Sequence, residues 1–237
     1  MKIFLILLGL IVSFITTSDN VFAKGDKSAP DRAEGEGPYK RLILRGGILV
    51  TGEGAPARGP MDIVIENDRI TQIVNVGNPG VPIISKHRPV ANKGDKEINI
   101  EGQYVLPGFI DMHGHIGGSA NNIPAEYVFK LWLAHGITTV REPGSFNGAS
   151  WVMDHVNRSE NNTITAPRIV PYFAFGLGQE EPITTPKQAR NWVKSIPKKG
   201  AKGIKFFGAT PEIMKAALIE AKKQGLGSIM HLYLKHL

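Results

Sequence analysis

The sequence contains no cysteine among its 237 residues. This absence excludes disulfide bonds, thiolate metal ligands and cysteine nucleophiles, so any metal site must use nitrogen and oxygen ligands. Aromatic residues make up only 8% of the chain. They do not alternate with the lysine pairs at 198–199 and 222–223, and we therefore expect no nucleic-acid partner. Long apolar runs are also absent, apart from one segment at the N-terminus.

The N-terminal segment has the pattern of an export signal. Lys2 precedes a nearly continuous apolar run over residues 3–15, and a small-residue site follows at 21–23. This order is typical of a secretory signal peptide, which predicts cleavage near Ala23 and export to the periplasm or the exterior. The run is shorter than the ~20 residues that span a bilayer, so we expect no stable membrane anchor.

The rest of the chain has globular composition, with 42% hydrophobic and 21% charged residues and a net charge of +7. Residues 24–40 are rich in charged residues, glycine and proline and lack apolar periodicity, which predicts a flexible, solvated leader. Residues 41–103 contain short strand-like runs separated by turn residues, among them Gly46-Gly47 between residues 42–44 and 48–50. This pattern predicts an antiparallel β module.

From residue 104 to residue 237, predicted strands and helices alternate. The strands end near residues 113, 140, 173, 205 and 231, about 30 residues apart, and helix starts are indicated at Pro124, Pro186 and Pro211. A (β/α)₈ barrel of ~250 residues has this repeat. A doubly wound open sheet shares it and is the alternative fold. We therefore predict an α/β protein, with a β-sandwich portion before an incomplete (β/α)₈ TIM barrel of about five strands.

The candidate chemical residues lie at the predicted strand ends. His113 and His115 are two residues apart on a predicted strand, so both side chains share one face with Asp111, as a metal ion would require. A pair of ordinary polar residues at a strand end is the alternative interpretation. Lys205 and His231 end later strands in the same register. A buried lysine is costly unless it is paired or modified, for example by carbon dioxide as a carbamate, and a lysine that reaches solvent is the alternative.

A further histidine, His155, falls within the predicted helix over residues 150–158. We expect it on the protein surface.

Two of these segments resemble a known family. Residues 105–115, with the sequence VLPGFIDMHGH, are similar to the hallmark of the amidohydrolase superfamily. Residues 136–144 resemble the second strand of its exported, imidazolonepropionase-like and prolidase-like branch, and the runs at 42–50 and 61–74 resemble the small β-sandwich that precedes the barrel.

The resemblance implies a function and a ligand set. His113 and His115 would bind the more buried metal, and His231 would bind the second. Lys205 as a carbamate would bridge the two metals. Asp111 would lie next to these ligands without binding metal itself. Family members with this lysine usually carry two divalent ions, often zinc. They hydrolyse carbon–nitrogen bonds in amides, dipeptides or cyclic amides, with a hydroxide that bridges the metals. The implied substrate is a small molecule or dipeptide.

The sequence departs from the family pattern after His231. The family also supplies a histidine from strand 6 and a catalytic aspartate from strand 8, and residues 232–237 contain no aspartate. His236 is not expected to be the missing ligand, because it lies only five residues beyond His231 and has no strand of its own. We therefore expect a chain truncated after barrel strand 5, and a catalytically inactive fragment that at most binds metal is the alternative function. A half-barrel exposes apolar sheet edges, which a homo-oligomer would cover. An interaction module built on the β-sandwich is a further alternative, although the sequence concentrates its motifs at the metal ligands.

Overall fold

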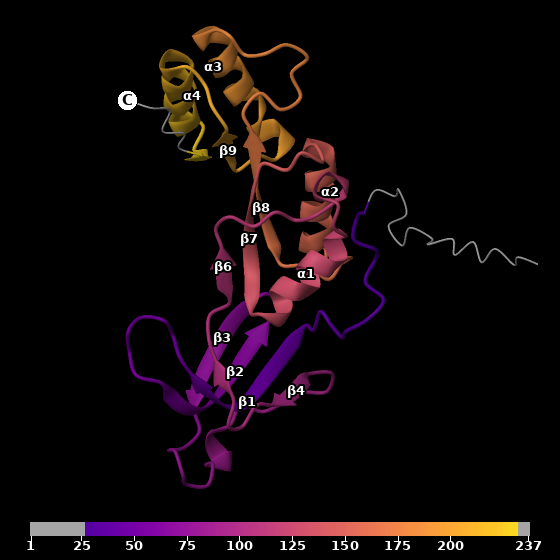
Figure 1. Ribbon diagram of the computed structural model, residues 1–237. Helices are drawn as coiled ribbons and strands as arrows, with labels where there is room; N and C mark the ends of the chain where they lie inside the picture. The colour runs from indigo at the N-terminus through magenta and orange to yellow at the C-terminus, as the bar shows by residue number, and fades with distance from the viewer. Residues whose placement is uncertain (1–26, 232–237) are drawn as a thin grey trace, which may run out of the picture.

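The computed structural model describes residues 27–231, which form two sheets joined by a short connection (Figure 1). The predicted signal peptide and the residues after His231 lie outside this range. Within the described range, every helix is too short or too polar to cross a membrane.

The first sheet corresponds to the predicted β module and has the order β3-β2-β1-β4, with β5 also paired to β1. Its strands are β1 (Arg41–Leu49), β2 (Arg58–Glu66), β3 (Arg69–Asn75), β4 (Lys96–Asn99) and β5 (Tyr104–Val105). The first three strands pair antiparallel, as expected, but β4 and β5 pair parallel to β1. The module is therefore a mixed sheet.

The turn expected at Gly46-Gly47 is instead a bulge within one continuous strand. The pairing register between β1 and β2 shifts between Leu44 and Gly47, and Gly46 has a φ of 77°. Glycine adopts this left-handed conformation without a steric penalty, so the strand can bend and continue. The bend also turns the Gly46 N–H toward the carboxylate of Asp62, at 2.9 Å.

Asp62 is the buried anion of this sheet. Its carboxylate accepts hydrogen bonds from Arg45 at 2.8 Å and from two nitrogens of Arg88 at 2.9 Å, in addition to the Gly46 N–H. Burial raises the pKa of the Asp62 carboxyl, but these hydrogen bonds outweigh burial and hold the pKa below its ordinary value. The contribution to stability is therefore present above the unfolded-state pKa and is lost as the pH falls through the folded-state pKa.

We expect Asp62→Asn to lower the free energy of unfolding by about 3 kcal/mol, because it leaves two arginines beside an uncharged amide in a buried site. Urea unfolding at neutral pH measures this change. The matched control is Glu97→Gln, which removes the more exposed partner of the same Arg45 and should cost no more than about 0.5 kcal/mol. Equal losses for the two variants would contradict the assignment.

The second sheet confirms the predicted partial barrel. Its strands are β6 (Phe109–Asp111), β7 (Ile137–Pro143), β8 (Arg168–Ala174), β9 (Gly203–Phe206) and β10 (Gly227–Met230), all parallel and in the order β10-β9-β8-β7-β6. Each strand is the spatial neighbour of the one before it in sequence. A doubly wound sheet instead reverses its strand order at a switch point. The sequential order therefore favours the barrel over the open-sheet alternative.

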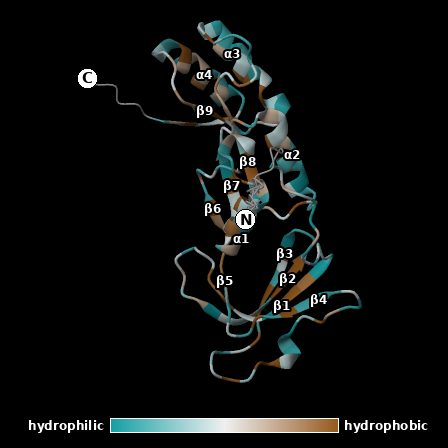
Figure 2. Ribbon diagram, turned by 45° about the vertical axis from the view of Figure 1, so that its right-hand side comes forward, coloured by the Kyte–Doolittle hydropathy of each residue, from teal (hydrophilic) through white to brown (hydrophobic). Residues whose placement is uncertain are grey.

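Helices α1 (Ala125–Ala134), α2 (Ala149–Glu160), α3 (Pro186–Ser195) and α4 (Pro211–Lys223) connect these strands (Figure 1). The helix starts predicted at Pro186 and Pro211 are confirmed. Two apolar clusters fill the space between helices and sheet, one around Trp192 and Phe206 and one around Phe129 and Val140. Hydropathy colouring follows this arrangement, with hydrophilic residues over much of the outer surfaces of α2 and α3 (Figure 2). The core thus holds the strands in place from their helical side.

The predicted leader is partly packed, which corrects the expectation of a solvated segment. Residues 27–34 lie against α1 and α2, and we call this segment the strap. Ala29 is 3% exposed and belongs to the apolar cluster around Phe129. Its N–H donates to Nε2 of His155 at 3.1 Å, and its carbonyl accepts from Arg158 at 2.6 Å. Backbone hydrogen bonds to Ala125 and Thr163 fix the two ends of the strap.

His155 is therefore a core residue, and the expectation that it lies on the surface is wrong. Its side chain is fully buried. Because Nε2 accepts from the Ala29 N–H, the ring proton is on Nδ1, which donates to the Trp151 carbonyl at 2.9 Å. Composition alone does not reveal this contact, since the partner of the histidine is a backbone group of a distant segment.

We predict that His155→Phe lowers the free energy of unfolding by about 1–3 kcal/mol, because it keeps an aromatic ring but leaves the buried Ala29 N–H without its acceptor. Chemical denaturation measures the loss. The exposed His87 provides the control, and His87→Gln should leave stability within about 0.5 kcal/mol of the wild-type chain. A His155→Phe variant as stable as wild type would show that the strap does not depend on this hydrogen bond.

Candidate metal centre

The predicted metal ligands meet at the carboxyl-terminal edge of the parallel sheet. His113 and His115 follow β6, Lys205 lies in β9, and His231 directly follows β10. The ring centroid of His113 is 5.7 Å from that of His115 and 5.8 Å from that of His231. The structure therefore brings together side chains from the first, fourth and fifth strands of this sheet.

The two histidines of the His-x-His pair are not on a strand, which corrects the sequence interpretation. Strand β6 ends at Asp111, whose carboxylate accepts the His113 N–H at 2.8 Å. An aspartate that bonds to the backbone two residues further on starts a turn, so the chain leaves the sheet at this point. His113 and His115 consequently lie in the loop over residues 112–116, which we call the histidine loop. The role of Asp111 shown here is to shape this loop.

Lys205 is the most unusual group at the site. Its residue is 1% exposed, and within residues 27–231 its Nζ has no hydrogen-bond partner. The nearest aromatic contact is the ring of Phe207, whose centroid is 5.5 Å from Nζ. Burial lowers the pKa of the Lys205 amine, and the Arg141 guanidinium lowers it further. The structure therefore excludes the alternative of a lysine that extends into solvent.

Positive charge dominates the electrostatics of the site. Burial lowers the pKa of His113, and the neighbouring cationic groups, Lys205 foremost, lower it further. The three histidines do not form a closed ligand set, since within residues 27–231 no group of three His, Asp or Glu side chains is arranged to hold a metal ion. A positive charge on Lys205 opposes the binding of a cation here, and a neutral or anionic Lys205 would favour it. The donor chemistry and the unpartnered Nζ both fit a carbamate on this lysine.

Glu142, at the end of β7, is a site residue that the sequence analysis missed. It is 1% exposed. One carboxylate oxygen lies 3.0 Å from Nδ1 of His115, and the other accepts the Ile116 N–H at 2.7 Å. The hydrogen bond to Glu142 raises the pKa of His115, although burial opposes the shift. The sequence does contain a signal for Glu142: it is an acidic residue at the end of the strand next to the His-x-His segment.

Gly144 leaves the space that Lys205 occupies. It has a φ of 95°, and a Cβ at this position would lie 3.2 Å from Cβ of Lys205 and 3.3 Å from the Ala174 nitrogen. Contacts this short force a neighbour to move. The end of β7 therefore contributes both a carboxylate and an open space to the site.

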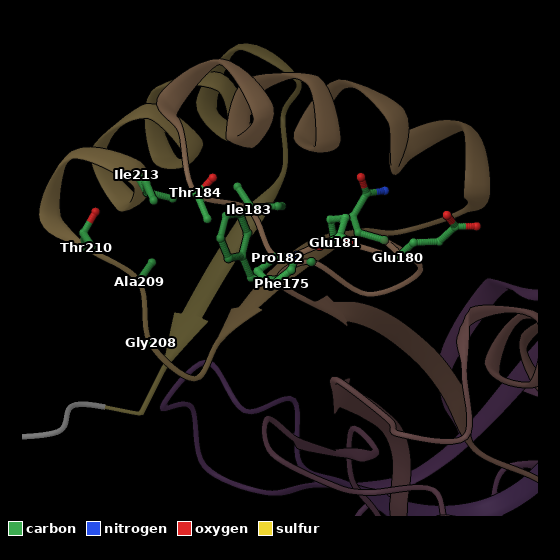
Figure 3. Close-up of a pocket in the computed structure, with 12 residues that line it drawn as sticks. Phe175, Glu180, Glu181, Pro182, Ile183, Thr184, Gly208, Ala209, Thr210 and Ile213 are labelled. Carbon is green, nitrogen blue, oxygen red and sulfur yellow. The ribbon is translucent and has the colours of Figure 1, made fainter.

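A pocket of about 610 Å³ lies at the same edge of the sheet, between the loops that follow β8 and β9. Ile213 and Thr210 lie at one end of it and Glu180 and Glu181 at the other, with Phe175 and Ile183 between them (Figure 3). The pocket adjoins the strand of the lysine, because the Phe175 N–H donates to the Lys205 carbonyl at 2.8 Å.

Comparison with known proteins now identifies the family. Residues 104–237 match the model of the amidohydrolase family. This chain belongs to the amidohydrolase family. The match covers the whole partial barrel, with the histidine loop, the lysine strand and His231. Among curated relatives, the chain is 30% identical over 138 residues to adenine deaminase 2 of Agrobacterium fabrum, which is 55% of this chain and 20% of that protein.

A second curated relative matches a shorter stretch, and solved structures match most of the chain in fold. Adenine deaminase 2 of Latilactobacillus sakei is 40% identical over 91 residues, which is 36% of this chain and 15% of that protein. Among solved structures, a Xaa-Pro dipeptidase with bound methionine has a TM-score of 0.62 at 20% identity, and a prolidase from Bifidobacterium longum has 0.61 at 24%. Each alignment covers 81% of this chain, with 56% of the dipeptidase and 49% of the prolidase. The likeness to these two structures is one of fold, and the chain spans about half of their length.

We expect Gly144→Ala in this amidohydrolase chain to lower the free energy of unfolding by more than Gly148→Ala does. Gly148 has nearly the same φ, 94°, but a Cβ there meets nothing within 4 Å, so this variant costs only the backbone strain of about 1–2 kcal/mol. Gly144→Ala adds the displacement of Lys205. Urea denaturation of both variants measures the difference, and equal losses would contradict the close contact with the lysine.

Proposed function

We propose that this chain carries the metal-binding part of an exported hydrolase that cleaves carbon–nitrogen bonds of small molecules. One observation carries the proposal. A buried amine without a hydrogen-bond partner in residues 27–231 lies in a cluster with His113, His115 and His231 at the edge of a parallel sheet. In a barrel of this kind that edge is the catalytic end. Membership of the amidohydrolase family supports the same function.

Lys205 is proposed to act after carboxylation. Its lowered pKa favours the neutral amine, whose nitrogen lone pair attacks carbon dioxide. A nitrogen–carbon bond forms, one carbon–oxygen π bond opens, and the proton leaves the nitrogen for solvent. The product is a carbamate with one negative charge. The side chain of Lys205 then attracts a cation instead of repelling it. As a carbamate, it would bind the metal as a ligand, whereas its amine has no partner within residues 27–231.

We propose that His113 and His115 hold one divalent ion, that the carbamate of Lys205 holds the same ion and a second, and that His231 holds the second. Zinc suits a site of nitrogen and oxygen donors without thiolates. The ions would supply a nucleophile from water near neutral pH and polarise the scissile bond. The substrates named by the relatives and structural neighbours, adenine and dipeptides, each present a carbon–nitrogen bond.

The alternative is a chain that binds metal but does not catalyse. Turnover of adenine, dipeptides or N-acyl amino acids by the zinc-loaded chain would support the hydrolase, whereas zinc binding without turnover would support the alternative.

The carbamate gives a direct test, because zinc affinity must depend on dissolved carbon dioxide. Zinc titration of the full chain by calorimetry should show at least tenfold tighter binding with bicarbonate than in buffer depleted of carbon dioxide. ¹³C-labelled bicarbonate should give a carbamate signal in the wild-type chain. Lys205→Arg, which keeps the charge but cannot be carboxylated, should lose both effects.

The matched control is Lys202→Arg, which changes an exposed lysine three residues earlier and should behave as wild type. His113→Ala should reduce the zinc bound per chain without changing the fold, as judged by circular dichroism. Zinc binding that is insensitive to bicarbonate and to Lys205→Arg would exclude the carbamate assignment.

A further inference from the structure

A single buried carboxylate connects the end of β7 to the histidine loop. We propose that Glu142 is a positioning residue, which holds His115 in the tautomer and orientation that direct its Nε2 toward a metal ion. The metal ion in this inference rests on the proposed function. The role of Glu142 rests on its contacts with His115 and Ile116. Glu142 belongs to no predicted ligand set, and its role is to act through His115.

The two oxygens of Glu142 face two donors from consecutive residues. Oε2 accepts the Ile116 N–H at 2.7 Å, and a backbone N–H can only donate. Oε1 lies 3.0 Å from Nδ1 of His115. With a carboxylate at this distance, the proton of the neutral ring is on Nδ1, which leaves the Nε2 lone pair free. A histidine ligand whose other nitrogen donates to a carboxylate is held in one ring orientation.

Other contacts hold the rest of the histidine loop to β7. The Gly114 N–H donates to the Arg141 carbonyl at 3.1 Å, and Nε of Arg141 donates to the Met112 carbonyl at 2.7 Å. Ile116 is fully buried in the apolar cluster around Phe129. The loop backbone is therefore fixed independently of Glu142 at several points, and the one contact that also controls a ring nitrogen comes from Glu142.

Gly114 shows how closely the loop approaches its neighbours. A Cβ at this position would lie 2.4 Å from a methyl carbon of Val140 and 2.6 Å from the Trp132 ring. The loop cannot move toward β7 to compensate for a shorter side chain at position 142. The length of the Glu142 side chain therefore fits the distance between β7 and the two donors of the histidine loop, at His115 and Ile116.

The geometry requires a carboxylate rather than an amide. Ile116 and His115 face different oxygens of Glu142, and glutamine replaces one of these oxygens with an NH₂ donor, so it keeps an acceptor toward only one of the two residues. If its oxygen keeps the Ile116 N–H, its NH₂ faces Nδ1 and donates to it. The ring proton then moves to Nε2, and the nitrogen that should bind metal is blocked. Glu142→Gln therefore changes the tautomer while preserving size and burial.

The test uses the full chain with ¹⁵N-labelled histidine. In the metal-free wild type, the nitrogen shifts of His115 should report the Nδ1–H tautomer, and in Glu142→Gln they should report Nε2–H. Zinc affinity of Glu142→Gln should fall by about 10- to 100-fold, as for other residues that orient a metal ligand. The control is Glu220→Gln, which changes another buried carboxylate, on α4, that accepts from Gln224 directly after the helix, and should alter neither reading.

Two results would overturn the proposal: an Nε2–H tautomer of His115 in the metal-free wild type, or a folded Glu142→Gln variant that binds zinc as tightly as wild type. The wild-type tautomer needs no variant, so it decides the matter even if Glu142→Gln does not fold. Glu142→Asp, one methylene shorter, should also weaken zinc binding because it cannot span both donors. A wild-type chain that binds no zinc but shows the Nδ1–H tautomer would contradict the proposed function and leave the orientation of His115 by Glu142 supported.

Discussion

The parallel pairing of β6 to β10 is the constraint on which the site depends. In a parallel sheet all carboxyl-terminal strand ends meet at one edge, so residues far apart in sequence become neighbours there. Strands β6 and β10 are the two edges of this sheet, and neighbouring strands lie about 4.8 Å apart, so a flat sheet would keep their ends well separated. The sheet must therefore curl to bring the ring centroids of His113 and His231 to 5.8 Å. The helices and the two apolar clusters stabilise the same register from the outer side of the sheet. Packing and ligand geometry are thus consequences of one topology.

The register also concentrates charge of one sign. Lys205 and Arg141 approach the histidines, and the buried carboxylate of Glu142 is already committed to His115 and Ile116. A buried amine in such a place carries a desolvation cost without a compensating ion pair. Gly144 has no side chain, and this leaves room for Lys205 in its buried position. A buried amine with no partner among residues 27–231 is the group that the proposed carboxylation of Lys205 requires.

Much of the fold follows from the sequence, because its signals are local. The β/α repeat, the helix starts at Pro186 and Pro211 and the partial barrel depend on periodicity and on proline chemistry, which act within a few residues. The predictions are wrong where a contact between distant segments determines the local structure. At the bulge, the Gly46 N–H bonds to Asp62 of the neighbouring strand, and the buried ring of His155 bonds to the backbone of Ala29. Glu142 was missed because its importance lies in reaching a loop of another strand.

The strap contacts the chain between the histidine loop and α1. The chain between His115 and α1 is held at its start by Glu142 and at its end by the strap, where the Lys27 carbonyl accepts the Ala125 N–H at 2.9 Å and the Lys27 amine bonds to the side chain of Asn122. A loop fixed at both ends loses little conformational entropy when a ligand binds. The proposed cleavage near Ala23 would keep the strap on the mature chain. Residues that resemble a leader in composition are then part of the framework that orders the proposed metal ligands.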